Sequence, residues 1–175
     1  MWYNLLEDQN PPKGNTVGSR SKINCAYIAG FLDGDGSLML QIKKRTDGKI
    51  KFRFMPTICF YQDSRHEKTL HWIREVFGIG YISHRNDGMT ELRINGYKQI
   101  EAILSDLQPY LRFKKVQASA LQKACKLLSS KKFSKMTRAQ MIQLVDLVLV
   151  IQNENYVTKK KKSRDELLKM LDLTP

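Results

Sequence analysis

The chain has 175 residues and carries 30 lysine and arginine residues against 17 aspartate and glutamate residues, a formal net charge of +13. This length provides for one domain with a sizeable core, and the charge favours a polyanionic partner, nucleic acid before an anionic membrane. The sequence shows no apolar run long enough to cross a bilayer and no signal-peptide segment after Met1, so we expect no membrane partner.

The three cysteines, Cys25, Cys59 and Cys125, lack metal-ligand spacing and therefore predict reduced thiols in an intracellular compartment. An organelle (chloroplast or mitochondrion) and a prokaryotic cytoplasm both stay open.

The first 22 residues are polar, and Pro11-Pro12-Lys13-Gly14-Asn15 interrupts any periodicity, so residues 1–22 are predicted to be a flexible basic arm. Arg20 and Lys22 either contact a phosphate or belong to a plain disordered leader. The predicted domain spans residues 23–155, and residues 156–175 form a basic segment with a short helix.

The segment 24–37 opens as a predicted helix. Ala26, Gly30 and Gly34 stand four apart, so one face of this helix is nearly bare backbone, which permits close approach of a second helix. The helix then runs into Asp33-Gly-Asp-Gly36, at the end where the macrodipole disfavours anions by ~0.3–1 kcal/mol each. Carboxylates placed against this preference indicate a functional site, and a carboxylate beside backbone carbonyls suits a hard divalent cation.

Alternating apolar and polar residues over 37–45 and 50–62 predict a β-hairpin with its turn at Thr46-Asp-Gly-Lys49. Pro56 predicts an edge position or a bulge in the second strand. The 13 residues of that strand reach ~43 Å, slightly beyond one turn of duplex DNA, ~34 Å. A ribbon with an apolar underside and a basic upper face suits a major groove. The alternative is an ordinary solvated sheet face.

A helix is predicted to start at Asp63-Ser-Arg-His-Glu67, with Ser64 and Glu67 as a capping box, and to end at Gly78. A second hairpin pairs 81–85 with 91–95, and a helix over 97–107 ends before Pro109. These elements predict an α+β fold with an αββαββα core, in which helices cover one side of a four-stranded antiparallel DNA-binding sheet.

Two further helices are predicted over 113–129 and 137–155. The run Lys159-Lys-Lys-Lys162 precedes a capping box from Ser163 to Glu166 and a short last helix. This lysine run is either only solvated or contacts flanking phosphates.

Side chains on the outer face of the two predicted hairpins are the candidates for reading DNA. Arg and Lys suit guanine, Gln suits adenine, and Glu accepts a hydrogen bond from cytosine. The candidates are Gln41, Lys43, Arg45, Lys51, Arg53, Arg85, Glu91 and Arg93.

Asp35 is the candidate catalytic acid, because the sequence has no phosphate-binding loop of the Walker type, no paired-cysteine zinc pattern and no nucleophilic-serine elbow. Phosphodiester hydrolysis needs an activated water and charge neutralisation, both of which divalent cations supply. One Asp per chain offers too few of the six oxygens that Mg²⁺ requires, so we expect a symmetric homodimer that brings two Asp35 carboxylates together. Its predicted interface comprises Ala26, Gly30, Phe31 and Gly34.

The nonapeptide Ile28-Ala-Gly-Phe-Leu-Asp-Gly-Asp-Gly36 resembles the LAGLIDADG motif of homing endonucleases. Two later segments, Gly78-Ile-Gly-Tyr81 and Leu107-Gln-Pro-Tyr-Leu111, resemble the single-motif, homodimeric branch found in group I introns. The resemblance covers about residues 23 to 170.

By this resemblance, Asp35 and the Gly34 carbonyl bind Mg²⁺, for which Mn²⁺ can substitute. Each active site of the family cuts one strand across the minor groove and leaves short 3′ overhangs. Gln62 matches the residue that holds the water network, and Lys114 matches the basic residue near the scissile phosphate. The third family position, typically Arg or Lys, falls on His66 with Arg65 beside it, so which of them serves stays open.

The leading hypothesis is a homodimeric, metal-dependent, site-specific DNA endonuclease that acts on a long pseudo-palindromic target. One alternative is an intron maturase that binds RNA, and another is a DNA-binding regulator that has lost cleavage. Asp35, Gln62 and Lys114 favour the endonuclease, because a protein that only binds needs no acid beside phosphates.

Overall fold

The computed structural model describes residues 19–45, 52–155 and 161–173. Helix α1, Lys22–Asp35, begins where the Ser21 side chain accepts a hydrogen bond from the Asn24 backbone N–H. Strand β1, Gly36–Lys44, follows with no intervening loop. Gly36 permits this change of direction, because a Cβ there would lie 2.8 Å from the Leu32 carbonyl oxygen. The predicted opening helix and first strand are confirmed, and the helix includes both aspartates of the motif.

Strand β2, Phe52–Asp63, pairs antiparallel with β1 in a constant register from Gly36↔Phe60 to Lys44↔Phe52. Pro56 lies in the part of β2 that has only β1 as its neighbour, because pairing with strand β4, Met89–Asn95, begins at Thr57. The predicted edge position of this proline is therefore confirmed, whereas the constant register leaves no bulge there. The predicted turn at 46–49 lies outside the described residues.

A short 3₁₀ turn, Ser64–His66, leads into helix α2, Lys68–Phe77, which ends at Gly78 with a left-handed φ of 67°. The predicted capping box in this segment is wrong. The side chains of Ser64 and Glu67 instead both form hydrogen bonds with Thr90 of strand β4. The Thr90 hydroxyl lies 2.8 Å from Ser64 Oγ and donates to the Glu67 carboxylate at 2.8 Å.

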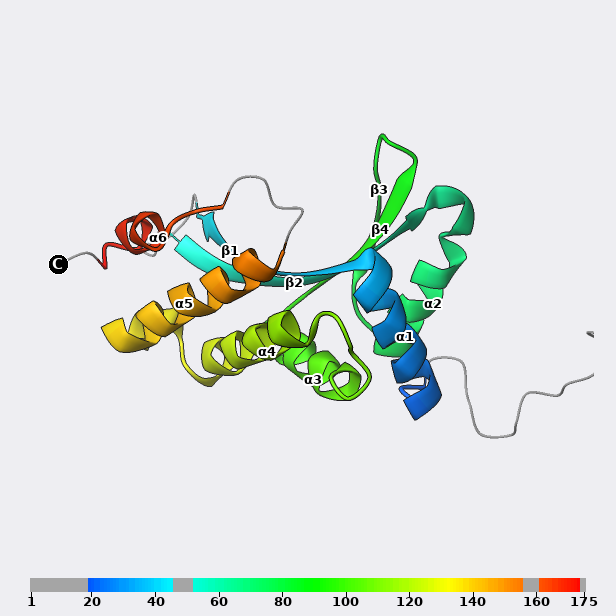
Figure 1. Cartoon of the computed structure of the whole chain (residues 1–175), viewed down its shortest axis with the longest axis horizontal. Helices are drawn as coiled ribbons and strands as arrows, with labels where there is room; N and C mark the ends of the chain where they lie inside the picture. Colours follow the sequence, from blue (N-terminus) through cyan, green and yellow to red (C-terminus); the bar gives the residue numbers. More distant parts are fainter. Residues whose placement is uncertain (1–18, 46–51, 156–160, 174–175) are drawn as a thin grey trace, which may run out of the picture.

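The second predicted hairpin is confirmed as β3, Tyr81–His84, and β4, Met89–Asn95. Together with the first hairpin it forms a four-stranded antiparallel sheet in the order β1-β2-β4-β3. The predicted α+β architecture is also confirmed, because helix α1 and the helices α3 (Tyr97–Leu107), α4 (Lys115–Ser130) and α5 (Arg138–Glu154) lie on one side of this sheet (Figure 1).

The remaining helices follow the expected order; α3 has the predicted bounds, and the boundaries of α4 and α5 are shifted by one or two residues. They are α3, Tyr97–Leu107; α4, Lys115–Ser130; α5, Arg138–Glu154; and α6, Arg164–Met170, with a 3₁₀ turn at Phe133–Lys135. The predicted capping box from Ser163 to Glu166 is present at the start of α6. No helix of the described segments is long and apolar enough to span a membrane.

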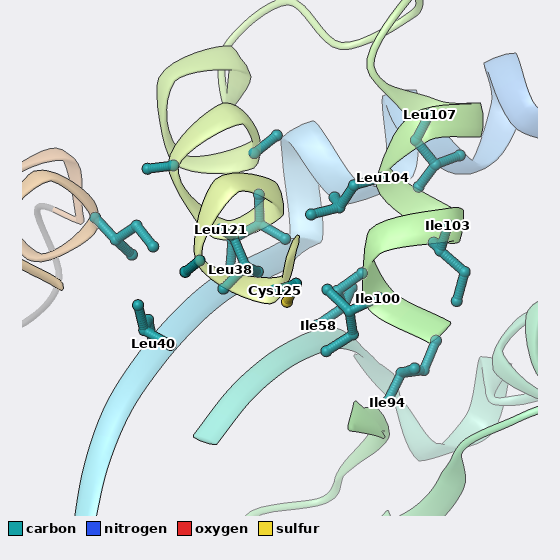
Figure 2. Packing of buried hydrophobic residues seen from close by; sticks show 14 of the residues in the cluster. Leu38, Leu40, Ile58, Ile94, Ile100, Ile103, Leu104, Leu107, Leu121 and Cys125 are labelled. Carbon is teal, nitrogen blue, oxygen red and sulfur yellow. The ribbon is translucent and has the colours of Figure 1, made fainter. Parts of the chain in front are cut away.

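The hydrophobic core lies between the sheet and the helices, and the predicted apolar face of the strands contributes to it. Leu38, Phe54, Ile58 and Phe60 are at most 1% exposed. Figure 2 shows side chains of β1 and β2 beside those of α3 and α4. Burial of each such side chain contributes about 1.5–3 kcal/mol, so the register of the sheet is fixed and the alternate residues face away from the helices.

Candidate active site

Asp35 is the last residue of α1, and both Asp35 and the preceding Gly34 are exposed. The carbonyls of the last helical turn have no intrahelical donors, and the negative pole of the helix dipole lies at the same end. A carboxylate beside such carbonyls offers hard oxygen ligands at a point of negative potential, which fits Mg²⁺. Across the described residues, no three His, Cys, Asp or Glu side chains cluster in a way that could hold a metal ion.

Asp33, two residues earlier, has a different environment. Its carboxylate accepts hydrogen bonds from three consecutive backbone N–H groups, those of Arg112 at 2.5 Å, Phe113 at 3.2 Å and Lys114 at 2.9 Å. These groups immediately precede α4, where a carboxylate also complements the helix dipole. Asp33 therefore ties the end of α1 to the start of α4, a role that sequence reasoning missed because its partners lie about eighty residues away.

Lys114 is held at the same junction. Its Nζ donates to the Asp33 backbone carbonyl at 2.5 Å. Burial lowers the pKa of Lys114 below the usual lysine value, and the negative charges of Asp33 and Asp35 only partly offset this effect. The structure thus brings Lys114 and Asp35 into one electrostatic environment at the end of α1.

Gln62 lies near the end of β2, two residues beyond the Gly36↔Phe60 pair, and His66 lies in the 3₁₀ turn that follows. Gln62 is half-buried, and its Oε1 accepts a hydrogen bond from the Asp63 backbone N–H at 2.9 Å. His66 is exposed at the end of the 3₁₀ turn. Arg65 donates three times to Asp63, from Nε, Nη2 and its backbone N–H at 2.9 Å each, and these bonds hold the pKa of Asp63 well below its usual range. The roles of Gln62, His66 and Arg65 stay predictions.

The small-residue face of α1 is open. Ala26, Gly30 and Gly34 are exposed, and a Cβ added at either glycine would meet no described atom within 4 Å. Ile23, 70% exposed, and Tyr27, 57% exposed, extend the same face. Sequence reasoning missed these two residues, although their spacing to Gly30 and Gly34 follows the helical period.

Phe31 differs from the rest of the predicted interface. Its ring lies parallel to that of Phe60 in β2, with 6.0 Å between the centroids, and it packs against the core while staying partly exposed. Only part of this side chain is available to a second subunit, and its interface role stays a prediction.

The outer face of the sheet carries most of the predicted DNA-reading side chains. Lys43 and Arg53 are exposed and directly opposite each other in the register, Gln41 is half-buried, and Arg45 is exposed at the end of β1. Arg85 is exposed in the β3–β4 turn. Lys51, which belongs to the same predicted set, lies outside the described residues.

Glu91 departs from the sequence expectation of an outward-facing side chain. It lies on the expected face of β4 but is only 5% exposed. The physical reason is a close ion pair with Arg93, whose Nε and Nη2 donate to the Glu91 carboxylate at 2.7 Å and 3.1 Å. A DNA-reading role for Glu91 or Arg93 stays a prediction.

The family model described as LAGLIDADG endonuclease matches residues 28–127. The chain therefore belongs to the LAGLIDADG endonuclease family, as the nonapeptide at residues 28–36 predicts. It carries this motif once and is of the single-motif homing endonuclease type.

Two curated relatives are DNA endonucleases. I-CvuI from Chlorella vulgaris is 32% identical over 111 residues, which cover 63% of this chain and 69% of the relative. I-CreI from Chlamydomonas reinhardtii is 28% identical over 143 residues, or 82% of this chain and 85% of the relative.

Solved structures share the fold. The crystal structure of I-CvuI in complex with its target in the presence of Ca superposes with a TM-score of 0.75 at 26% identity, over 86% of this chain and 96% of the other. An archaeal intron-encoded homing endonuclease, I-Vdi141I, complexed with DNA, gives a TM-score of 0.73 at 20% identity, over 86% of this chain and 95% of the other.

Proposed function

We propose that this chain is a site-specific DNA endonuclease that acts as a homodimer on a long pseudo-palindromic target. It makes a divalent-metal-dependent double-strand break with short 3′ overhangs. The observation that carries this proposal is the exposed Asp35 at the carboxyl end of α1, directly adjoining the open face of small residues on the same helix.

The homodimer is supported by the surface of α1. Ile23 and Tyr27 are large apolar side chains in water, and contiguous exposed apolar surface marks interaction sites. Gly30 and Gly34 continue this surface with no side chain to keep a second backbone away. In an isologous contact the same patch occurs on both subunits. A two-fold axis that runs between the two copies of α1, parallel to them, then places both Asp35 carboxylates at the same end of the paired helices.

A divalent cation held by Asp35 and the Gly34 carbonyl, Mg²⁺ with Mn²⁺ as substitute, would neutralise charge on the phosphate and activate a water molecule. The side chains around it have separate tasks. The Lys114 ammonium places a positive charge beside the scissile phosphate, and Asp33 fixes the backbone that carries it. The Gln62 amide and His66 or Arg65 hold water and phosphate oxygens by hydrogen bonds.

The DNA-binding surface is supported by the geometry and charge of the sheet. The 12 residues of β2 reach about 40 Å, more than one turn of duplex DNA. Lys43 of β1 and Arg53 of β2 are exposed on the outer face of the sheet, and the chain carries a net charge of +13. Two copies of this ribbon, related by the two-fold axis, match two half-sites of one target.

Cleavage of duplex DNA is the test. The purified protein is incubated with a randomised duplex library in Mg²⁺, in Mn²⁺ and in EDTA, and the ends of any cut molecules are sequenced. Discrete double-strand breaks with 3′ overhangs at one long sequence, in both metals and not in EDTA, are expected. Tight binding of intron RNA without any DNA cleavage would contradict the proposal and favour a maturase.

A further inference from the structure

Arg93 and Glu91 form a closed ion pair on the outer face of β4, the face turned away from the helices. Glu91 is 5% exposed, whereas the Arg93 side chain is 34% exposed. Arg93 Nε and Nη2 donate to the two Glu91 oxygens at 2.7 Å and 3.1 Å. Cys59 Sγ, on the neighbouring strand, lies 3.8 Å from the same carboxylate. Glu91 is thus enclosed, while Arg93 reaches solvent.

This pairing leaves a defined edge of the guanidinium for a ligand. An arginine has five N–H donors in one plane, and the bonds to Glu91 use two of them, on Nε and on Nη2. Of the three N–H donors that remain, two, one on each terminal nitrogen, point along the end of the plane. Two parallel donors in that arrangement match the O6 and N7 acceptors of guanine in the major groove.

The same geometry removes Glu91 from base reading. Both carboxylate oxygens accept bonds from Arg93, and the side chain is buried. A cytosine amino group would have to displace the arginine and leave two charges without their partners. The exposed pair Arg85–Asp87 in the adjacent turn is different, because its side chains are 46% and 53% exposed and are joined by one bond of 2.8 Å.

We propose that Arg93 reads a guanine in each half-site of the DNA target and that Glu91 is a positioning residue that holds the Arg93 guanidinium in the reading orientation. This inference rests on the proposed function, since it names a specificity-determining contact of the same DNA surface. Because Glu91 fixes the guanidinium before DNA arrives, Arg93 loses less rotamer freedom on binding.

The test is a base-by-base specificity profile. Wild-type protein and the variants Arg93→Ala, Glu91→Gln and Glu75→Gln are each bound to a randomised duplex library in Ca²⁺ at one fixed salt concentration, and bound sequences are counted. Wild type is expected to prefer guanine at one symmetric pair of positions by ~5- to 150-fold. Arg93→Ala removes that preference alone. Glu91→Gln lowers it about 10-fold at the same positions, because the amide keeps only one acceptor for the guanidinium.

Glu75→Gln is the matched control, because Glu75 is exposed on α2 and the substitution changes the charge in the same way. Its profile is expected to equal that of wild type. Thermal melting shows whether Glu91→Gln is folded. If it is not, Arg93→Lys replaces it, since lysine keeps the charge but lacks the planar fork, and the guanine preference is again expected to fall.

Two outcomes overturn the inference. A Glu91→Gln profile that changes at positions other than those of Arg93→Ala would mean that Glu91 contacts a base itself. Equal weakening of all duplexes by Arg93→Ala would mean that Arg93 contacts only phosphate. A wild-type profile without any sequence preference is distinguishable from both, because it refutes the proposed site-specific endonuclease as a whole.

Discussion

Replacement of Asp33 by asparagine separates its structural role from that of a metal ligand. The Asp33 carboxylate accepts three backbone N–H groups through two oxygens, Oδ1 for Lys114 and Oδ2 for Arg112 and Phe113. An asparagine has one acceptor oxygen, so its amide group must face at least one N–H donor. The remaining bonds also lose the strengthening that a charged acceptor provides.

The magnitude follows from these bonds. A hydrogen bond to a charged group contributes about 1.5–3 kcal/mol, and water can replace part of it because Arg112 and Phe113 are exposed. We expect Asp33→Asn to lower the free energy of unfolding by ~2 kcal/mol, which for a chain of this length lowers Tm by about 4–8 °C. Cleavage should slow at every Mg²⁺ concentration, because the Lys114 backbone N–H loses its charged acceptor and the residue is held less firmly, while affinity for the target is retained.

Calorimetry and cleavage kinetics measure the two effects. The matched control is Asp106→Asn, because Asp106 forms an exposed ion pair with Arg20 at 3.2 Å and such pairs contribute ~0–1 kcal/mol. Stability of Asp33→Asn equal to that of Asp106→Asn would refute the reasoning. So would a variant whose cleavage recovers fully at high Mg²⁺, because that result would make Asp33 a metal ligand.

Three further outcomes are expected from the same site. Asp35→Asn should slow cleavage by ~10³-fold or more while specific binding in a gel-shift assay is unchanged; equal loss of both would contradict a metal-binding role. Gly30→Leu should keep the fold, because a Cβ there meets no described atom, but should weaken the homodimer at least ~10-fold by sedimentation, and Ala102→Leu on exposed α3 surface should not. Because burial lowers the pKa of Lys114, its charge is lost at a lower pH than that of an ordinary lysine, so cleavage should fall as pH rises toward 10.5, and Lys114→Arg should move this loss to higher pH. If the pH profile of Lys114→Arg equals that of wild type, deprotonation of Lys114 is not the cause of the loss of cleavage at high pH.

Features set by neighbouring residues in the sequence could be predicted. Alternation with period two identifies the buried face of β1 and β2, because a slip by one residue would expose Leu38 and Ile58. Gly78 ends α2 in a left-handed conformation, and Pro56 marks the stretch of β2 that β4 does not pair. Each of these signals depends on backbone sterics or on burial of one face, and both can be evaluated within a short window of sequence.

Features set by partners across the fold could not be predicted. Ser64 and Glu67 have capping-box spacing, yet the Thr90 hydroxyl from another strand competes for both side chains. Glu91 alternates with outward-facing positions, but its burial depends on Arg93 along the strand and on Cys59 of the neighbouring strand β2. A local pattern gives the face on which a side chain lies and does not give the group that neutralises it there.

The two aspartates of the motif show the same limit within three residues. Residues two apart on a helix point about 200° apart around its axis, so Asp33 and Asp35 face different surroundings although both follow the same apolar run. Asp33 faces its own chain and accepts the backbone N–H groups before α4. Asp35 is exposed at the helix end, beside a face that offers room for a second helix. Folding of one chain therefore fixes Lys114 through Asp33, whereas in the proposed homodimer the Asp35 of another copy adds to the oxygen ligands for Mg²⁺. Binding of one protomer to DNA without its partner would thus leave the duplex intact.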